Sequence, residues 1–210
     1  MKIIQNPNIK FKKTLSKRPY TKRIVIHHSA SSDSTTVENI QQWHYSRGWS
    51  GIGYHYMIDQ QGVITQGRPE DTQGAHAYQD KDHEANTDGI GICVIGNFMT
   101  QKPTDEQISS LVWLVKNIQS RYGKIPIIGH RDVMPTSCPG ESFPLAEVRE
   151  QVNNGKGDDI VQVSLHGYIE DVPAINKEGN FYIPVRWLGR LGYKVEWDDK
   201  RQIVSVSYKQ

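Results

Sequence analysis

Cysteine is scarce in this 210-residue chain, and long apolar segments and a large surplus of either charge are absent. The two cysteines, Cys93 and Cys138, are too few for a disulfide-stapled scaffold, so any sulfur chemistry must come from a single thiol. No segment approaches the ~18 apolar residues of a membrane-spanning helix, and we expect no membrane span. The first 22 residues also lack the apolar run of a secretory signal, which predicts synthesis in the cytoplasm.

The net charge of +2 conceals an uneven distribution. Residues 1–23 carry eight Lys or Arg and no acid, whereas residues 24–159 carry 10 basic and 17 acidic side chains. The basic N-terminal arm, residues 1–22, is compatible with an anionic polymer as partner, or with a solvated leader that packs loosely on the domain. No nucleic-acid-binding motif accompanies the arm, so we do not expect nucleic acid as a partner.

Apolar runs that predict strands alternate along the chain with amphipathic stretches that predict helices. The continuous apolar run at 89–96 is typical of a central strand. Capping-box patterns at Thr35 to Glu38 and at Thr104 to Gln107 predict the starts of two helices, the first of which places Trp43 in the core. This alternation predicts an α/β domain with a central mixed β-sheet flanked by helices. The other predicted elements are strands at 23–28, 54–59, 63–66 and 125–129 and a helix at 145–152.

A second, smaller domain is indicated beyond a change of composition. Residues 153–159 are polar and Gly-rich without periodicity, which predicts a linker between a domain at 23–152 and another at 160–210. The second segment alternates like strands around one helical stretch at 185–191, and this pattern predicts a small α+β domain. Its predicted strands lie at 161–165, 194–197 and 203–207.

The strongest local signal for chemistry is a histidine followed by a cysteine. His130 and Cys138 stand eight positions apart across a loop that contains Pro135, and such a loop can present both side chains to one ion. Imidazole and thiolate suit Zn²⁺, and a catalytic zinc site needs three protein ligands. His27 or His28 can supply the third if their strand lies beside the one that ends at Gly129. The pair alone is weak evidence and favours a hydrogen-bonded structural histidine over a metal ligand.

Five motifs in order carry a resemblance to a known family. The chain contains IVIHHSA at 24–30, GYHY at 53–56, GAHA at 74–77, IGI and GNF at 90–92 and 96–98, and GHRD with CPG at 129–132 and 138–140. Together they resemble the zinc-dependent N-acetylmuramoyl-L-alanine amidases, the type 2 amidase family that includes the amidase-type phage lysozymes and the peptidoglycan recognition proteins. The resemblance extends over about residues 20–150.

The resemblance implies a zinc site with a supporting shell. Its zinc ligands would be His27, His130 and Cys138, with His28 beside the site, because adjacent residues of a strand point to opposite faces. Asp132 would orient a ligand histidine from behind rather than act as a base. The remaining cysteine, in the apolar strand 89–96, is expected to be a small core residue.

The resemblance also implies catalytic and substrate-binding residues. Tyr54 would donate a hydrogen bond to the attacking water or to the oxyanion, and Thr136 occupies a position where the phage lysozymes carry a lysine and the recognition proteins often carry threonine. His55, His76 and Asn97 would line the muropeptide groove. For each of these residues the alternative is an ordinary packing or hydrogen-bonding role.

The implied reaction is hydrolysis, by a zinc-activated water, of the amide between N-acetylmuramic acid and L-alanine in peptidoglycan. A phage or prophage endolysin of this kind acts on the wall after release from the cytoplasm. The alternative is a non-catalytic recognition protein that binds peptidoglycan. Such proteins commonly lack the cysteine ligand, so the presence of Cys138 favours an enzyme. The sequence makes no prediction of oligomeric state.

Residues 160–208 resemble the small domain named after the amino-terminal domain of copper amine oxidases. The resemblance rests on IPVRWL at 183–188, LGYKV at 191–195 and WD at 197–198. No copper site is expected, because His166 is the only histidine of this stretch and cysteine is absent from it. The expected role is attachment to the cell wall, by association with an amidase, and the alternative is an inert folding or dimerisation module.

Overall fold

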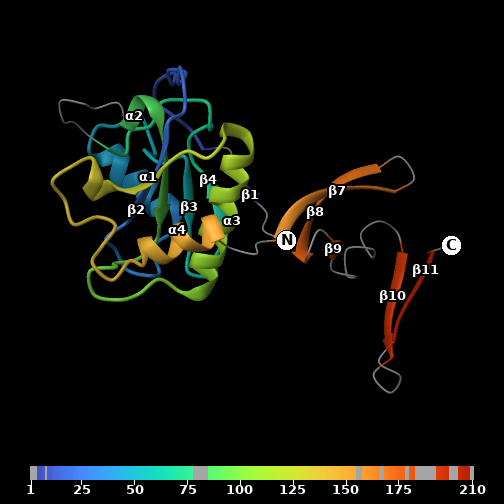
Figure 1. Ribbon diagram of the computed structural model, residues 1–210. Coiled ribbons are helices and arrows are strands. Elements are labelled where there is room, and N and C mark those ends of the chain that lie inside the picture. The colour runs from blue at the N-terminus through green and yellow to red at the C-terminus, as the bar shows by residue number, and fades with distance from the viewer. Residues whose placement is uncertain are drawn as a thin grey trace. The chain divides into compact units, whose positions relative to one another are not determined.

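The computed structural model describes residues 4–7, 9–77 and 85–154, together with the C-terminal strands at 158–165, 168–177, 180–182, 193–198 and 203–208 (Figure 1). The chain divides into two compact units, residues 2–153 and the part from residue 154 onward. Within the described residues, no helix has both the length and the apolarity to cross a membrane.

A six-stranded mixed sheet forms the centre of the first unit, in the order β1-β4-β3-β5-β2-β6. Strand β2 is parallel to both β5 and β6, and β3 joins the antiparallel partner β4 through a tight turn at Gly62, where φ is +73°. This arrangement confirms the predicted α/β fold with a mixed sheet. The strands are β1 (Ile4–Gln5), β2 (Arg23–His28), β3 (Tyr56–Ile58), β4 (Ile64–Gln66), β5 (Gly89–Val94) and β6 (Ile127–Gly129).

The helices begin at capping boxes, one of which lies a residue away from its predicted position. The cap of α1 (Val37–Ser46) is Thr36 with Asn39 as its reciprocal partner, so the prediction of Thr35 with Glu38 is wrong by one residue. The predicted cap of α3 (Asp105–Tyr122), Thr104 with Gln107, is confirmed. The remaining helices are α2 (Ala85–Asp88), the short 3-10 turn η1 (His130–Asp132) and α4 (Leu145–Asn154).

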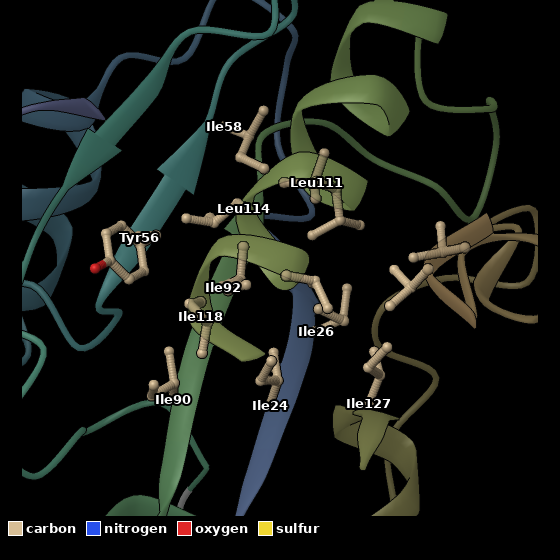
Figure 2. Close-up of a cluster of buried hydrophobic side chains, with 14 of the residues drawn as sticks. Ile24, Ile26, Tyr56, Ile58, Ile90, Ile92, Leu111, Leu114, Ile118 and Ile127 are labelled. Atoms are coloured by element: carbon tan, nitrogen blue, oxygen red, sulfur yellow. The ribbon is translucent and has the colours of Figure 1, made fainter. Parts of the chain in front are cut away.

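The two faces of the sheet are buried by different helices. On one face, isoleucines of β2 and β5 pack on the apolar side of α3, as Figure 2 shows for Ile24, Ile26 and Ile92 beside Leu114 and Ile118. On the other face a smaller cluster contains Ile40 of α1, Met57 and Cys93. Alternation along β2 therefore directs Ile24 and Ile26 toward α3, and Val25 toward Ala77 and Ala85 on the opposite face.

Trp43 is not a core residue. Its side chain is 42% exposed, although it lies at helical spacing from Ile40 in α1. The buried positions of α1 are Ile40 and His44, four residues apart, so the inward stripe of this helix is narrower than the apolar pattern predicts. The prediction of a core position for Trp43 is wrong.

The basic arm is bound along the first unit. Strand β1 pairs with β4, the amide of Lys12 donates to the carbonyl of Ser50, and the hydroxyl of Tyr45 donates to the carbonyl of Lys10. Lys17 forms an ion pair with Asp71. The arm therefore packs more closely on the first unit than the interpretation as a loosely packed, solvated leader predicts.

The second unit contains a three-stranded antiparallel sheet and a separate two-stranded antiparallel pair. The predicted strands at 161–165, 194–197 and 203–207 are confirmed, whereas β8 (Tyr168–Lys177) and β9 (Asn180–Tyr182) are not among the predicted strands. The predicted linker is too long at both ends, because α4 continues to Asn154 and β7 begins at Asp158. The predicted helix at 185–191 lies outside the described residues. The strands are β7 (Asp158–Leu165), β8 (Tyr168–Lys177), β9 (Asn180–Tyr182), β10 (Tyr193–Asp198) and β11 (Ile203–Tyr208).

Candidate metal centre

The parallel pairing of β2 with β6 brings two histidines to the same edge of the sheet. Ile26 lies opposite Gly129, so His27 and His130 come directly after a paired position at the carboxyl ends of neighbouring strands. Their ring centroids are 4.4 Å apart. The sequence predicts a third ligand from strand 23–28 only if this strand lies beside the strand that ends at Gly129. The structure shows that these two strands, β2 and β6, are paired neighbours.

The loop after His130 folds back and delivers the cysteine. The amide of Arg131 donates to the carbonyl of Cys138 at 2.8 Å, and the amide of Cys138 donates to the hydroxyl of Thr136 at 3.3 Å. As a result, one ligand atom from each of His27, His130 and Cys138 lies within 4.8 Å of the others. The group is consistent with the metal site of a zinc amidase.

Bond geometry and hydrogen bonding both fit a tetrahedral zinc ion. Nδ1 of His27 is 3.8 Å from Sγ of Cys138, close to the roughly 3.6 Å that Zn–N and Zn–S bond lengths imply for two tetrahedral ligands. The other ring nitrogen of His130, Nε2, donates to Sδ of Met134 at 3.1 Å, which leaves Nδ1 free for a metal. The backbone amide of His28 donates to Sγ of Cys138 at 3.4 Å and would stabilise a thiolate there.

Burial sets the protonation of these groups in the metal-free chain. Desolvation, together with the neighbouring His76 and His130, lowers the pKa of His27 well below its usual value. Burial likewise lowers the pKa of His130 and raises the pKa of the Cys138 thiol to about 11. The imidazoles are thus neutral and ready to bind at neutral pH, whereas metal binding must displace the thiol proton.

Tyr54 stands beside the ligands. Its ring centroid is 5.2 Å from that of His27, and the amide of Gly53, the residue before it, donates to Nδ1 of His44 at 3.0 Å. Burial, followed by the neighbouring Cys93 and Cys138 side chains, raises the pKa of the Tyr54 phenol well above its usual value. The hydroxyl therefore keeps its proton at neutral pH and is a hydrogen-bond donor.

His28 and Asp132 lie beside the candidate metal ligands, as expected, but they make other contacts than the expected ones. The ring of His28 points to the α3 face, where Nδ1 accepts from the amide of Phe98 at 3.2 Å, so His28 supports the site through its backbone. The Asp132 carboxylate accepts from the amide of Gly129 at 2.9 Å and from Arg149 at 3.2 Å. Asp132 thus fixes the backbone before His130, and its role in orienting a ligand histidine stays a prediction. Cys93 is fully buried, as expected for a core residue.

Two of the three residues expected in a substrate groove are buried. The His55 ring is fully buried, with Nδ1 accepting from the amide of Gly91 and Nε2 beside Arg18 and the carbonyl of Thr72. Only 7% of His76 is exposed, and its Nδ1 is occupied by His27. Neither ring presents a free nitrogen to solvent, and the contacts of His55 and His76 with substrate stay predictions.

Asn97 and Thr136 are partly exposed, and their predicted contacts with substrate stay predictions. The side chain of Asn97 accepts from the amide of Met99 at 3.2 Å and caps the turn that follows β5.

Sequence reasoning missed His44, which holds Tyr54 in place. The His44 ring lies 5.6 Å from the Tyr54 ring and 4.6 Å from the Trp49 ring, and burial lowers its pKa to about 4. Its spacing of four residues from Ile40 in an amphipathic helix was the available signal that it points inward.

Comparison with known proteins agrees with this geometry. The family model described as N-acetylmuramoyl-L-alanine amidase matches residues 16–141, and the model described as copper amine oxidase N-terminal domain matches residues 162–210. The chain belongs to the N-acetylmuramoyl-L-alanine amidase family. It is a peptidoglycan amidase similar to phage endolysins, joined to a C-terminal domain of the second family, as the sequence motifs indicate.

Individual relatives match more than half of this chain. The endolysin of Escherichia phage T7 is 33% identical over 150 residues, which are 67% of this chain and 95% of the phage protein. Peptidoglycan-recognition protein SC2 of Drosophila melanogaster is 36% identical over 136 residues, 59% of this chain and 71% of its own length. The solved structure of N-acetylmuramoyl-L-alanine amidase LysC from Clostridium intestinale URNW is 35% identical with a TM-score of 0.67, covering 73% of this chain and 99% of LysC.

Proposed function

We propose that this protein hydrolyses the amide between N-acetylmuramic acid and the L-alanine of the stem peptide, with Zn²⁺ held by His27, His130 and Cys138. The convergence of two imidazoles and one thiol within 4.8 Å supports this proposal most directly. Three ligands of this type leave a fourth tetrahedral position for water or substrate, as in catalytic rather than structural zinc sites.

The proposed roles of Tyr54 and Thr136 follow from the hydroxyl protons that they can donate. Zn²⁺ in such a site supplies a Lewis acid that makes water nucleophilic near neutral pH. The protonated Tyr54 hydroxyl donates to the oxygen on which negative charge develops when the lactyl carbonyl is attacked. The Thr136 hydroxyl accepts from the Cys138 amide, so its own proton is available for the same oxygen. The C–N bond then breaks, and the L-alanine amine takes its proton from the attacking water.

The endolysin role is favoured over a binding-only recognition protein. Cys138 is present and its sulfur accepts a hydrogen bond from His28, so the site is complete for metal binding. The chain also spans 95% of the length of the T7 endolysin. We propose that the protein is a phage or prophage endolysin, which acts on the wall after release from the cytoplasm.

Digestion of purified cell walls tests the activity. We expect the protein to release new L-alanine amino termini without new reducing sugars, to lose this activity with a strong chelator and to regain it with added Zn²⁺. Amino termini and reducing ends are measured on the same digest. New reducing ends, or no release after zinc is restored while the protein still binds walls, would contradict the amidase proposal and favour a glycosidase or a recognition protein.

We propose that the second unit attaches the enzyme to the wall. Its family match and its separation from the amidase unit support a distinct task, and relatives such as the T7 endolysin contain little beyond the amidase unit. A chain that ends at Asn154, after the last turn of α4, should keep its activity on soluble muropeptides and lose sedimentation with insoluble walls. Unchanged sedimentation of this truncated chain would refute the attachment role and favour an inert module.

A further inference from the structure

We infer that His76 is a positioning residue that fixes the tautomer and ring orientation of His27, so that zinc affinity depends on a buried side chain that is not itself a ligand. This inference rests on the zinc site of the proposed function. It assigns His76 a task other than the substrate contact that its motif implies.

The contact between the two rings determines where their protons lie. Nε2 of His27 is 3.0 Å from Nδ1 of His76, while Nδ1 of His27 faces Sγ of Cys138. A nitrogen that binds a metal carries no proton, so the proton of His27 must be on Nε2. Nε2 of His27 therefore donates, Nδ1 of His76 accepts, and the proton of a neutral His76 is on its own Nε2.

The backbone around His76 is shaped to hold its ring in this position. A Cβ atom at Gly91 in β5 would come within 2.3 Å of the ring, and one at Gly74 within 2.4 Å, so both glycines make room for it. The side-chain oxygen of Asn86 accepts from the amides of His76 and Ala77 at 2.7 and 3.0 Å and fixes the backbone. The His76 ring is thus constrained from both sides.

Within the described residues, Nε2 of His76 is buried and has no hydrogen-bond partner. Orientation of the ring therefore depends on its packing, on the contact with His27 and on the nearby backbone of Gly89, which favours a proton on His76. A zinc-binding histidine commonly donates its second N–H to an acceptor that orients it, and loss of that acceptor typically costs about 10–100-fold in metal affinity. In this chain the acceptor is a neutral imidazole.

Variants of the full chain that differ only in the acceptor test the inference. His76→Asn places an amide oxygen near the position of Nδ1, whereas His76→Leu fills similar space without an acceptor. We expect His76→Leu to bind zinc about 10–100-fold more weakly than the wild type and His76→Asn to recover most of that loss. Zinc dissociation constants are measured by competition with a chromophoric chelator, and thermal unfolding of the metal-free variants reports folding.

Two further variants keep the test decisive. If His76→Leu does not fold, His76→Gln replaces it, because its amide lies one atom further out, near the position of Nε2, and we expect weaker zinc binding than in His76→Asn. His44→Asn is the control for loss of a buried histidine. The His44 ring contacts the Tyr54 and Trp49 rings, neither of which is a proposed zinc ligand, so this variant should bind zinc within a few-fold of the wild type.

Equal zinc affinity in the wild type and in the variant without an acceptor at the Nδ1 position would overturn the inference. Failure of the proposed function gives a different result. A wild-type protein that binds zinc tightly but cleaves no wall amide refutes the amidase proposal and leaves the dependence on His76 measurable.

Discussion

Replacement of Cys138 by alanine is expected to lower zinc affinity by about 10²–10³-fold, if the 10–16 kcal/mol of a four-ligand zinc site is shared among its ligands. Amidase activity should fall below detection at low micromolar zinc. The physical reason is the loss of the one ligand that carries negative charge, which His28 stabilises through its amide. Chelator competition gives the affinity, and release of L-alanine amino termini gives the activity.

Cys93→Ala is the matched control for the removal of a thiol. Cys93 is fully buried in β5 opposite His27, but it lies outside the group of converging ligand atoms. The Cys93→Ala protein should bind zinc within a few-fold of the wild type. Cys138→Ala should still sediment with walls, which separates loss of metal from loss of fold. A Cys138→Ala protein that binds zinc and releases amino termini normally would remove the thiolate from the mechanism.

Replacement of Tyr54 by phenylalanine is expected to lower kcat by about 10²–10³-fold, the usual cost of removing one donor to a developing oxyanion. Zinc affinity should not change, because the Tyr54 ring centroid lies 5.2 Å from that of His27 and a phenol that keeps its proton is a poor zinc ligand. The high pKa of this phenol makes it a donor throughout the neutral range. Rates on a soluble muropeptide, with zinc content measured on the same sample, check the expectation.

The variant Thr136→Val distinguishes the catalytic contribution of the Thr136 hydroxyl from that of the Tyr54 hydroxyl. If Tyr54 is the main donor, Thr136→Val should cost much less than Tyr54→Phe. Its effect should appear partly in zinc affinity, because Thr136 accepts from the amide of Cys138. Full activity in Tyr54→Phe together with a large loss of kcat in Thr136→Val would transfer the oxyanion role to the threonine.

Local patterns predicted the elements of the first unit better than their edges. The apolar runs at 23–28 and 89–96 form the interior strands β2 and β5, because strands buried on both faces have continuous hydrophobic sequences. The cap of α1 was misplaced because Thr35 and Thr36 are equally good caps, and the choice depends on the reciprocal bond from Asn39. Strand β1 is two residues long and forms by pairing with β4, which no local pattern encodes.

Strand ends and one short loop predict a candidate site made of His130, Cys138 and either His27 or His28, and the family resemblance selects His27. His27 and His130 follow paired positions of neighbouring strands, and Cys138 returns on a loop that closes on Arg131. The burial of His55 and His76 was not predictable, because it depends on glycines and backbone groups from distant segments. A histidine in a motif has the same sequence signature whether it faces a substrate or supports a ligand from behind.

The most direct test of the account is the position of the oxygen that hydrolysis adds. Walls or a defined muropeptide are digested in H₂¹⁸O with the zinc-loaded protein, and the products are analysed by mass spectrometry. The account predicts one heavy oxygen in the lactyl carboxyl group of the glycan product and none in the released peptide, which begins with L-alanine. Heavy oxygen in a peptide carboxyl group or at a sugar reducing end would contradict the account.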